Sequence, residues 1–286
     1  MSAEVLRVSL LSTLGRPSLW RRRVLWSLLA GLVLALLVTL VWLAGRYEAS
    51  QVQSRLERDV GDAVGDIRAR LTRNVQSLQA LQFGEPRPAP WLAEATALLR
   101  ERRELLRIEW RDAHFGTHVQ AGTPYRPPVF ERLGRDSAHS EVVQVCNTAR
   151  RLSGPAYSGS YFVPLTDGLG LEVMEMCLPL ANGGVVMGYL VATYSLQDLL
   201  DDLARQLTRS QEVSFTEGDG TRLAMRGNAR RGSRVFSAQH LLDLPGTTLV
   251  LRMDSWRGAP ELFPNVLTAL VTAMSIALVS ILILLG

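Results

Sequence analysis

Two long apolar runs enclose a segment in which apolar and polar residues recur with shorter periods. Val24 to Gly45 is 22 residues without a charge, and Leu262 to Gly286 is 25. A helix of 22 residues is roughly 33 Å long, enough to cross the hydrocarbon core of a bilayer. A cleavable signal peptide is the alternative for the first run, but its apolar part would be shorter and would end at a small-residue site. The pattern therefore predicts two uncleaved transmembrane helices.

After the first run, Tyr47 to Phe83 predicts one long helix that continues the span. Its apolar residues are three or four positions apart and form a single stripe: Val52, Leu56, Val60, Val64, Ile67, Leu71, Val75, Leu78 and Leu81. Two uses of this stripe stay open. It packs along its own domain, or part of it also forms the seam of a homodimer.

The next 175 residues mix short helices with runs that alternate like strands. The predicted helices are Trp91 to Arg103, Ser140 to Leu152, one that opens at Ser195 with Asp198 as its capping partner, and a last helical stretch before the turn Leu244-Pro245-Gly246. The predicted strands are Leu105 to Trp110, His118 to Ala121, Gly159 to Pro164, Leu169 to Leu178, Val185 to Tyr194, Glu212 to Thr216, Thr221 to Met225, Arg234 to Ser237 and Thr247 to Met253. Asp167-Gly168 and Asn182-Gly183-Gly184 are expected turns.

These elements predict an α+β fold, with two transmembrane helices flanking a long helix and two antiparallel-sheet modules. The expected organisation is a tail at 1–23, a span at 24–45, a long helix at 46–83, a first module at 84–195, a connecting helix with a smaller module at 196–258, and a span at 262–286.

The charge distribution sets the expected topology. All 31 basic residues are arginine, and the first 23 residues carry a net charge of +4, whereas residues 46–261 are neutral overall. A neutral central segment argues against a nucleic-acid partner. Arginines before the first span predict a cytoplasmic N-terminus, so residues 46–261 are expected in the periplasm and the protein in a bacterial inner membrane as a multi-pass protein.

Three stretches carry a resemblance: Ala156 to Tyr161, Glu172 to Leu180, and Asn182-Gly183-Gly184 together with Gly188 to Leu196. With the element order, they resemble the extracytoplasmic double-Cache (PAS-like) sensor region of bacterial membrane receptors, most closely sensor histidine kinases of the C4-dicarboxylate type. The resemblance implies that the first module binds a small carboxylate or amino acid and that binding shifts the long helix. The kinase core of that family is absent, so phosphoryl transfer would reside outside this chain.

Two alternatives to a two-component sensor kinase stay open. The same sensor can serve a chemoreceptor or a cyclic-dinucleotide enzyme, or the chain can be a membrane-anchored adaptor that binds a protein.

The candidate ligand-binding residues supply positive charge, hydroxyl groups, an apolar wall and one carboxylate. They are Arg107, Trp110, Arg111, Arg150, Tyr157, Tyr161, Glu175 and Thr193. Strand alternation places Glu175 with Val173 and Cys177, but it does not say which face is inward. If Glu175 faces the pocket, the ligand is expected to carry an amine.

No catalytic motif is visible, and neither a cofactor nor a metal is expected. His114 and His118 have a suitable spacing for metal on a helix, but Gly116 between them indicates a turn and no third ligand is near in the sequence. Cys146 and Cys177 lie in the predicted oxidising compartment, where they form a disulfide or remain two separate buried residues.

Overall fold

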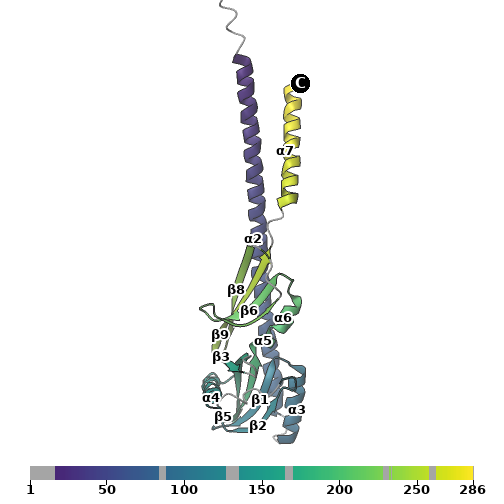
Figure 1. Ribbon diagram of the computed structural model, residues 1–286. Helices are drawn as coiled ribbons and strands as arrows, with labels where there is room; N and C mark the ends of the chain where they lie inside the picture. Colours follow the sequence, from purple (N-terminus) through teal and green to yellow (C-terminus); the bar gives the residue numbers. More distant parts are fainter. Residues whose placement is uncertain are drawn as a thin grey trace, which may run out of the picture. The chain divides into compact units, whose positions relative to one another are not determined.

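The computed structural model describes residues 17–83, 88–126, 135–164, 170–227, 232, 234–257 and 262–285. The chain divides into two compact units, one formed by Met1–Val52 with Ala259–Gly286 and the other by Gln53–Gly258. Helix α2 (Pro17–Phe83) runs without a break from the first unit into the second, as predicted for a long helix that continues the first span (Figure 1).

The first unit holds the apolar part of α2 and helix α7 (Leu262–Leu285). Among the described residues, one helix is long and apolar enough to cross a membrane, and it is α2. The apolar part of α7 that is described in full, Thr268–Ile281, is shorter than a span. The second span of the predicted pair therefore remains a prediction.

In the second unit, the apolar stripe of α2 is buried inside the unit itself. From Leu56 to Leu81 its apolar residues are at most 9% exposed, and they join one core with residues of both sheets. Packing along its own domain is thus the observed use of the stripe. Helix α3 (Pro88–Glu101) follows and adds Trp91, Ala95 and Leu99 to the same core.

A five-stranded antiparallel sheet forms the first module, with strand order β2-β1-β5-β4-β3. Its strands are β1 (Leu105–Asp112), β2 (Thr117–Gly122), β3 (Ala156–Pro164), β4 (Gly170–Asn182) and β5 (Val185–Ser195). The hairpin between β4 and β5 turns at Gly183 and Gly184, whose φ angles of +59° and +84° favour glycine. The expected turn at Asp167-Gly168 lies outside the described residues.

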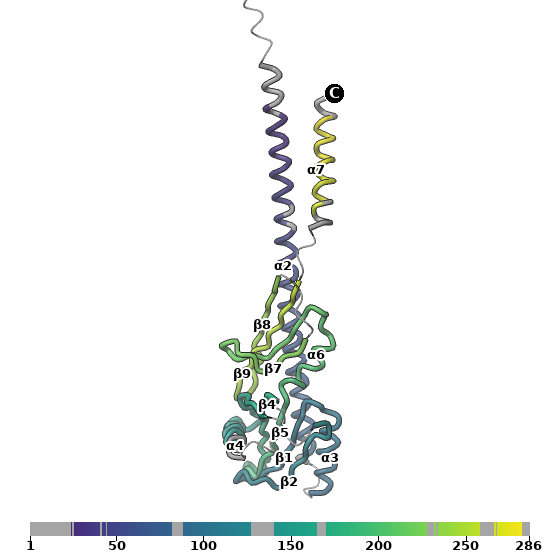
Figure 2. Tube along the Cα trace, viewed as in Figure 1, coloured from purple at the N-terminus to yellow at the C-terminus, as the bar shows by residue number. Residues whose placement is uncertain are grey.

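Two short helices connect the modules: α5 (Leu196–Leu199) and α6 (Asp201–Gln206). The predicted cap is confirmed, because the backbone N–H of Asp198 donates to Ser195 Oγ at 3.2 Å. The chain path through this connector is seen in Figure 2, where β5 leads through α6 into the second module.

The second module is a four-stranded antiparallel sheet of order β7-β6-β9-β8. Its strands are β6 (Gln211–Thr216), β7 (Arg222–Gly227), β8 (Arg234–Leu244) and β9 (Thr247–Arg257). The prediction of a helical stretch before Leu244 was wrong, because β8 continues to that residue. Ala238, Leu242 and Leu244 are buried at even spacings, which is the period of a strand.

The two faces of the five-stranded sheet have different covers. Met174, Met176 and Ala192 face the core that contains α2. Cys177 and Val191 face helix α4 (Arg135–Leu152), with which they form a separate apolar cluster. The α+β fold with two antiparallel sheets and one long helix is confirmed, and the α4-covered face carries the candidate site.

Candidate functional site

Three polar residues form a row across the middle of the five-stranded sheet. Arg107 of β1 pairs with Thr193 of β5, which in turn pairs with Glu175 of β4. Paired residues of neighbouring strands point to the same face. Since Cys177 shares that face with Glu175, the row lies on the side that α4 covers.

Glu175 is fully buried and its carboxylate accepts two hydroxyl groups. Tyr161 donates to Oε1 at 2.6 Å, and Thr193 donates to the two oxygens at 2.9 and 3.1 Å. The backbone N–H of Glu175 donates to Ser158 Oγ at 3.0 Å. The two side chains that donate to this carboxylate therefore come from the neighbouring strands, Tyr161 from β3 and Thr193 from β5.

Burial raises the pKa of the Glu175 carboxyl above its usual value, and the positive charge of Arg107 opposes this only in part. Burial, followed by the charge of Glu175, also raises the pKa of the Tyr161 hydroxyl. Tyr161 thus remains a donor, and Glu175 is a carboxylate whose charge a nearby cation would stabilise.

A second buried carboxylate lies next to the row. Glu109 of β1 is 2% exposed and stands between two arginines of the same strand and face. Its Oε1 is 2.9 Å from Arg107 Nη2, and its Oε2 is 2.6 Å from Arg111 Nη2 and 2.7 Å from Arg111 Nε. Arg111 also donates to the carbonyl of Phe115 at 3.2 Å. We refer to Arg107, Glu109, Arg111, Tyr161, Glu175 and Thr193 as the polar cluster.

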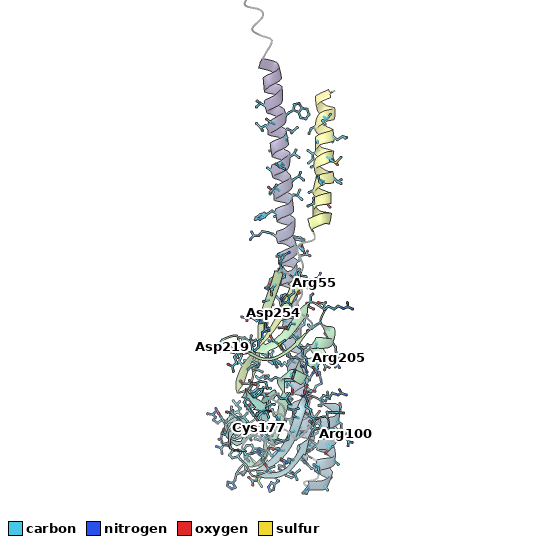
Figure 3. All side chains as sticks on the ribbon, viewed as in Figure 1. Arg55, Arg100, Cys177, Arg205, Asp219 and Asp254 are labelled. Carbon is cyan, nitrogen blue, oxygen red and sulfur yellow. A yellow bond between two sulfur atoms is a disulfide. The ribbon has the colours of Figure 1, made fainter. Side chains whose placement is uncertain are left out.

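Helix α4 is fixed over this face by a disulfide between Cys146 and Cys177, whose Cα atoms are 5.1 Å apart. The sequence left this pairing open. Figure 3 labels Cys177 among the side chains of the five-stranded sheet. Cys177 is two residues from Glu175 on the same face, so the bond attaches α4 directly beside the polar cluster. Within the part of α4 whose side chains are described, Val142, Val145 and Ala149 join Cys146 in the apolar cluster with the sheet.

Three of the predicted site residues lie elsewhere. Trp110 points to the opposite face of β1, where its ring centroid is 6.3 Å from that of Trp91. Arg150 is exposed near the end of α4. Neither side chain belongs to the polar cluster. Strand alternation turns Trp110 away from its neighbours Glu109 and Arg111.

Tyr157 is the third, and a β-bulge explains its position. Between Tyr157 and Ser160 the chain has one residue more than the partner strand β4, which shifts the alternation. Tyr157 consequently faces the α2 side, with its ring centroid 6.3 Å from that of Tyr194, while Tyr161 faces Glu175.

Two residues were missed from the sequence: Glu109, a member of the polar cluster, and Ser158, which accepts from the backbone N–H of Glu175. Glu109 lies midway between Arg107 and Arg111, and strand alternation alone would have placed all three on one face. Ser158 lies in the bulge of β3, for which the sequence carried no signal.

The polar cluster brings two guanidinium groups, two carboxylates and two hydroxyl groups together in a largely buried place. Guanidinium groups pair with anions and buried carboxylates with cations, so the cluster holds chemical partners for both kinds of charge.

No family model matches the chain, and no curated protein matches it in sequence. Solved structures share its fold at low identity. The extracellular ligand-binding receptor from Desulfohalobium retbaense DSM5692 is 13% identical, with a TM-score of 0.50, over 70% of this chain and 40% of that receptor. The ligand-binding domain of the Pseudomonas fluorescens chemoreceptor CtaA, solved with L-serine, is 12% identical, with a TM-score of 0.49, over 72% of this chain and 98% of that domain.

The ligand-binding domain of the Pseudomonas aeruginosa PAO1 chemoreceptor PctC, solved with GABA, is 14% identical, with a TM-score of 0.45, over 71% of this chain and 99% of that domain. At these identities the comparisons bear on the fold alone. Two antiparallel sheets arranged along one long helix give this chain a double-Cache-like fold.

Proposed function

We propose that this chain is the sensory and membrane-anchored part of a bacterial receptor that binds a small organic acid or amino acid at the polar cluster. The observation that carries the proposal is the burial of two carboxylates, Glu109 and Glu175, beside the buried Arg111 and the partly buried Arg107 on the α4-covered face. Burying ion pairs is seldom a gain in stability over apolar packing, because each ion loses its hydration. A binding role accounts for their retention.

Among small ligands, an amino acid matches the cluster best. Its carboxylate would be bound by the guanidinium groups of Arg107 and Arg111, for which planar anions are suitable partners. Its ammonium group would lie near Glu175, whose buried carboxylate gains from a cation. Tyr161 and Thr193, which donate to Glu175, would fix the position of that carboxylate.

The membrane arrangement belongs to the same proposal. Two spans with a cytoplasmic N-terminus would place residues 46–261 in the periplasm of a bacterial inner membrane, and the Cys146–Cys177 disulfide supports an oxidising compartment. Protease added to spheroplasts should therefore cleave within residues 46–261. An uncleaved segment would overturn this orientation.

The parent protein that we favour is a two-component sensor histidine kinase that acts as a homodimer, and a chemoreceptor or cyclic-dinucleotide enzyme is the alternative. In each case the ligand acts by population shift, so it must bind one packing of the helices more tightly than the other.

The test is ligand binding by the full chain in detergent, measured by thermal shift and calorimetry. The panel contains L-serine, L-arginine, GABA and C4-dicarboxylates. Glu175→Gln should abolish stabilisation by a ligand that stabilises the wild type. Glu172→Gln, a matched change of the same residue type on the same strand, should leave it intact. The absence of any stabilisation across the panel, or equal binding by Glu175→Gln, would refute the proposed site.

A further inference from the structure

One polar side chain interrupts the apolar stripe of α2 where the helix packs on the five-stranded sheet. Asn74 is fully buried between Leu71 and Leu78. Its Nδ2 donates to Glu104 Oε1 at 2.9 Å, across 30 residues of sequence. A buried amide in an apolar seam fixes one register of the helix, because any sliding of α2 breaks the bond.

Tyr194 of β5 is the second polar residue at this place. It is fully buried, and although burial raises the pKa of its hydroxyl, Asn74 is near enough to oppose that rise. Neither this hydroxyl nor Asn74 Oδ1 has a hydrogen bond of normal geometry to any described residue. The two groups are complementary, since one is a donor and the other an acceptor. A small shift of β5 along α2 would pair them, and a buried polar group gains from being paired.

The same end of β5 also reaches the polar cluster. Thr193, next to Tyr194, donates to both oxygens of Glu175 on the opposite face of the sheet. Ser195, the next residue, donates its backbone N–H to the carbonyl of Glu104 at 2.9 Å. Three consecutive residues therefore have three different neighbours. Thr193 contacts the candidate ligand site, Tyr194 faces helix α2, and Ser195 contacts Glu104, which binds Asn74.

We propose that Thr193–Ser195 of β5 is a switch, in which the Tyr194–Asn74 hydrogen bond is made in one state of the sensor and absent in the other. A ligand that changes the contacts between Glu175 and Thr193 moves the end of β5. The movement brings Tyr194 to Asn74 and changes how α2 is held on the sheet. This inference rests on the proposed sensor function and names the residues that carry its signal to the long helix.

The test measures amide hydrogen exchange of α2 in the full chain, in the peptides that cover residues 70–81. The perturbation at the site is Glu175→Gln, with Thr193→Val as a second variant in case the first fails to fold. Each is introduced into the wild type and into Tyr194→Phe, which removes the hydroxyl and keeps the ring. Tyr189→Phe is the matched control, because Tyr189 is also a buried residue of β5 but faces α4.

In the wild type and in Tyr189→Phe, the site variants should change the exchange rate of these peptides about five- to tenfold. One hydrogen bond of typical strength changes the equilibrium constant for local opening by about this factor. In Tyr194→Phe they should leave the rate unchanged. Equal changes in all three backgrounds, or no change in any, would overturn the switch. The experiment uses no ligand, so its failure is distinct from the failure of ligand binding, which the thermal-shift panel measures separately.

Discussion

Removing the Cys146–Cys177 disulfide should destabilise the unit Gln53–Gly258 by a calculable amount. The bond joins residues that are 31 positions apart. In the chain-entropy account, closing a loop of about this length stabilises the folded state by about 3.7 kcal/mol at 25 °C. The unit has roughly 200 residues, and an unfolding entropy of about 2.1 cal/mol/K per residue converts this loss into a Tm lower by about 9 °C.

The assay is thermal unfolding of the full chain in detergent, with and without reductant, for the wild type and for the double variant Cys146→Ala/Cys177→Ala. The double variant should unfold near the temperature of the reduced wild type, and reductant should not change its Tm. Both sulfurs are fully buried between α4 and the sheet, so a few degrees of further loss from packing is expected. An unchanged Tm after confirmed reduction would refute the conclusion that the bond holds α4 on the site face.

Three further variants test the site and the core by thermal unfolding. Burial raises the pKa of Glu175, so the folded state keeps a proton that the unfolded state releases above about pH 4.5. The stability of the folded state should therefore fall as the pH rises from about 4.5 through the folded-state pKa. Glu175→Gln should flatten this dependence of Tm on pH. Gly246→Val should cost about 1–3 kcal/mol, because its φ is +98° and a Cβ would lie 2.7 Å from a backbone oxygen, whereas Gly218→Val meets no atom within 4 Å. Leu71→Ala should cost about 2–5 kcal/mol, and Thr72→Ala on the exposed side of the same turn should change stability by less than about 0.5 kcal/mol. A flat pH dependence in the wild type, or equal losses within either matched pair, would contradict the corresponding assignment.

Local patterns were sufficient to predict most elements of the fold. The helical stripe from Leu56 to Leu81, the hairpin at Asn182-Gly183-Gly184 and the cap at Ser195 each depend on residues close together in sequence. Part of the strand β8 was missed because the adjacent residues Leu241 and Leu242 interrupt its alternation of apolar and polar residues. In this edge strand, pairing with β9 decides the conformation.

The composition of the site was harder to predict, because it depends on which face of a sheet a helix covers. Strand alternation places Arg107 and Arg111 on one face of β1, but only the packing of α4 through Cys146 decides that this face is enclosed. The bulge after Tyr157 reverses the alternation within β3, so two tyrosines four residues apart point to opposite faces. Neither effect has a signal in a single sequence, since both arise from contacts between distant segments.

The central claim is that the buried polar cluster binds a small charged ligand. The most direct measurement is the Tm of the full chain against amino-acid concentration, for the wild type beside Glu175→Gln. A ligand at about one hundred times its Kd should stabilise the wild type by about 2.7 kcal/mol, which raises its Tm by roughly 5–10 °C, and should leave Glu175→Gln unchanged. A ligand that stabilises both proteins equally, or a panel that stabilises neither, would contradict the claim.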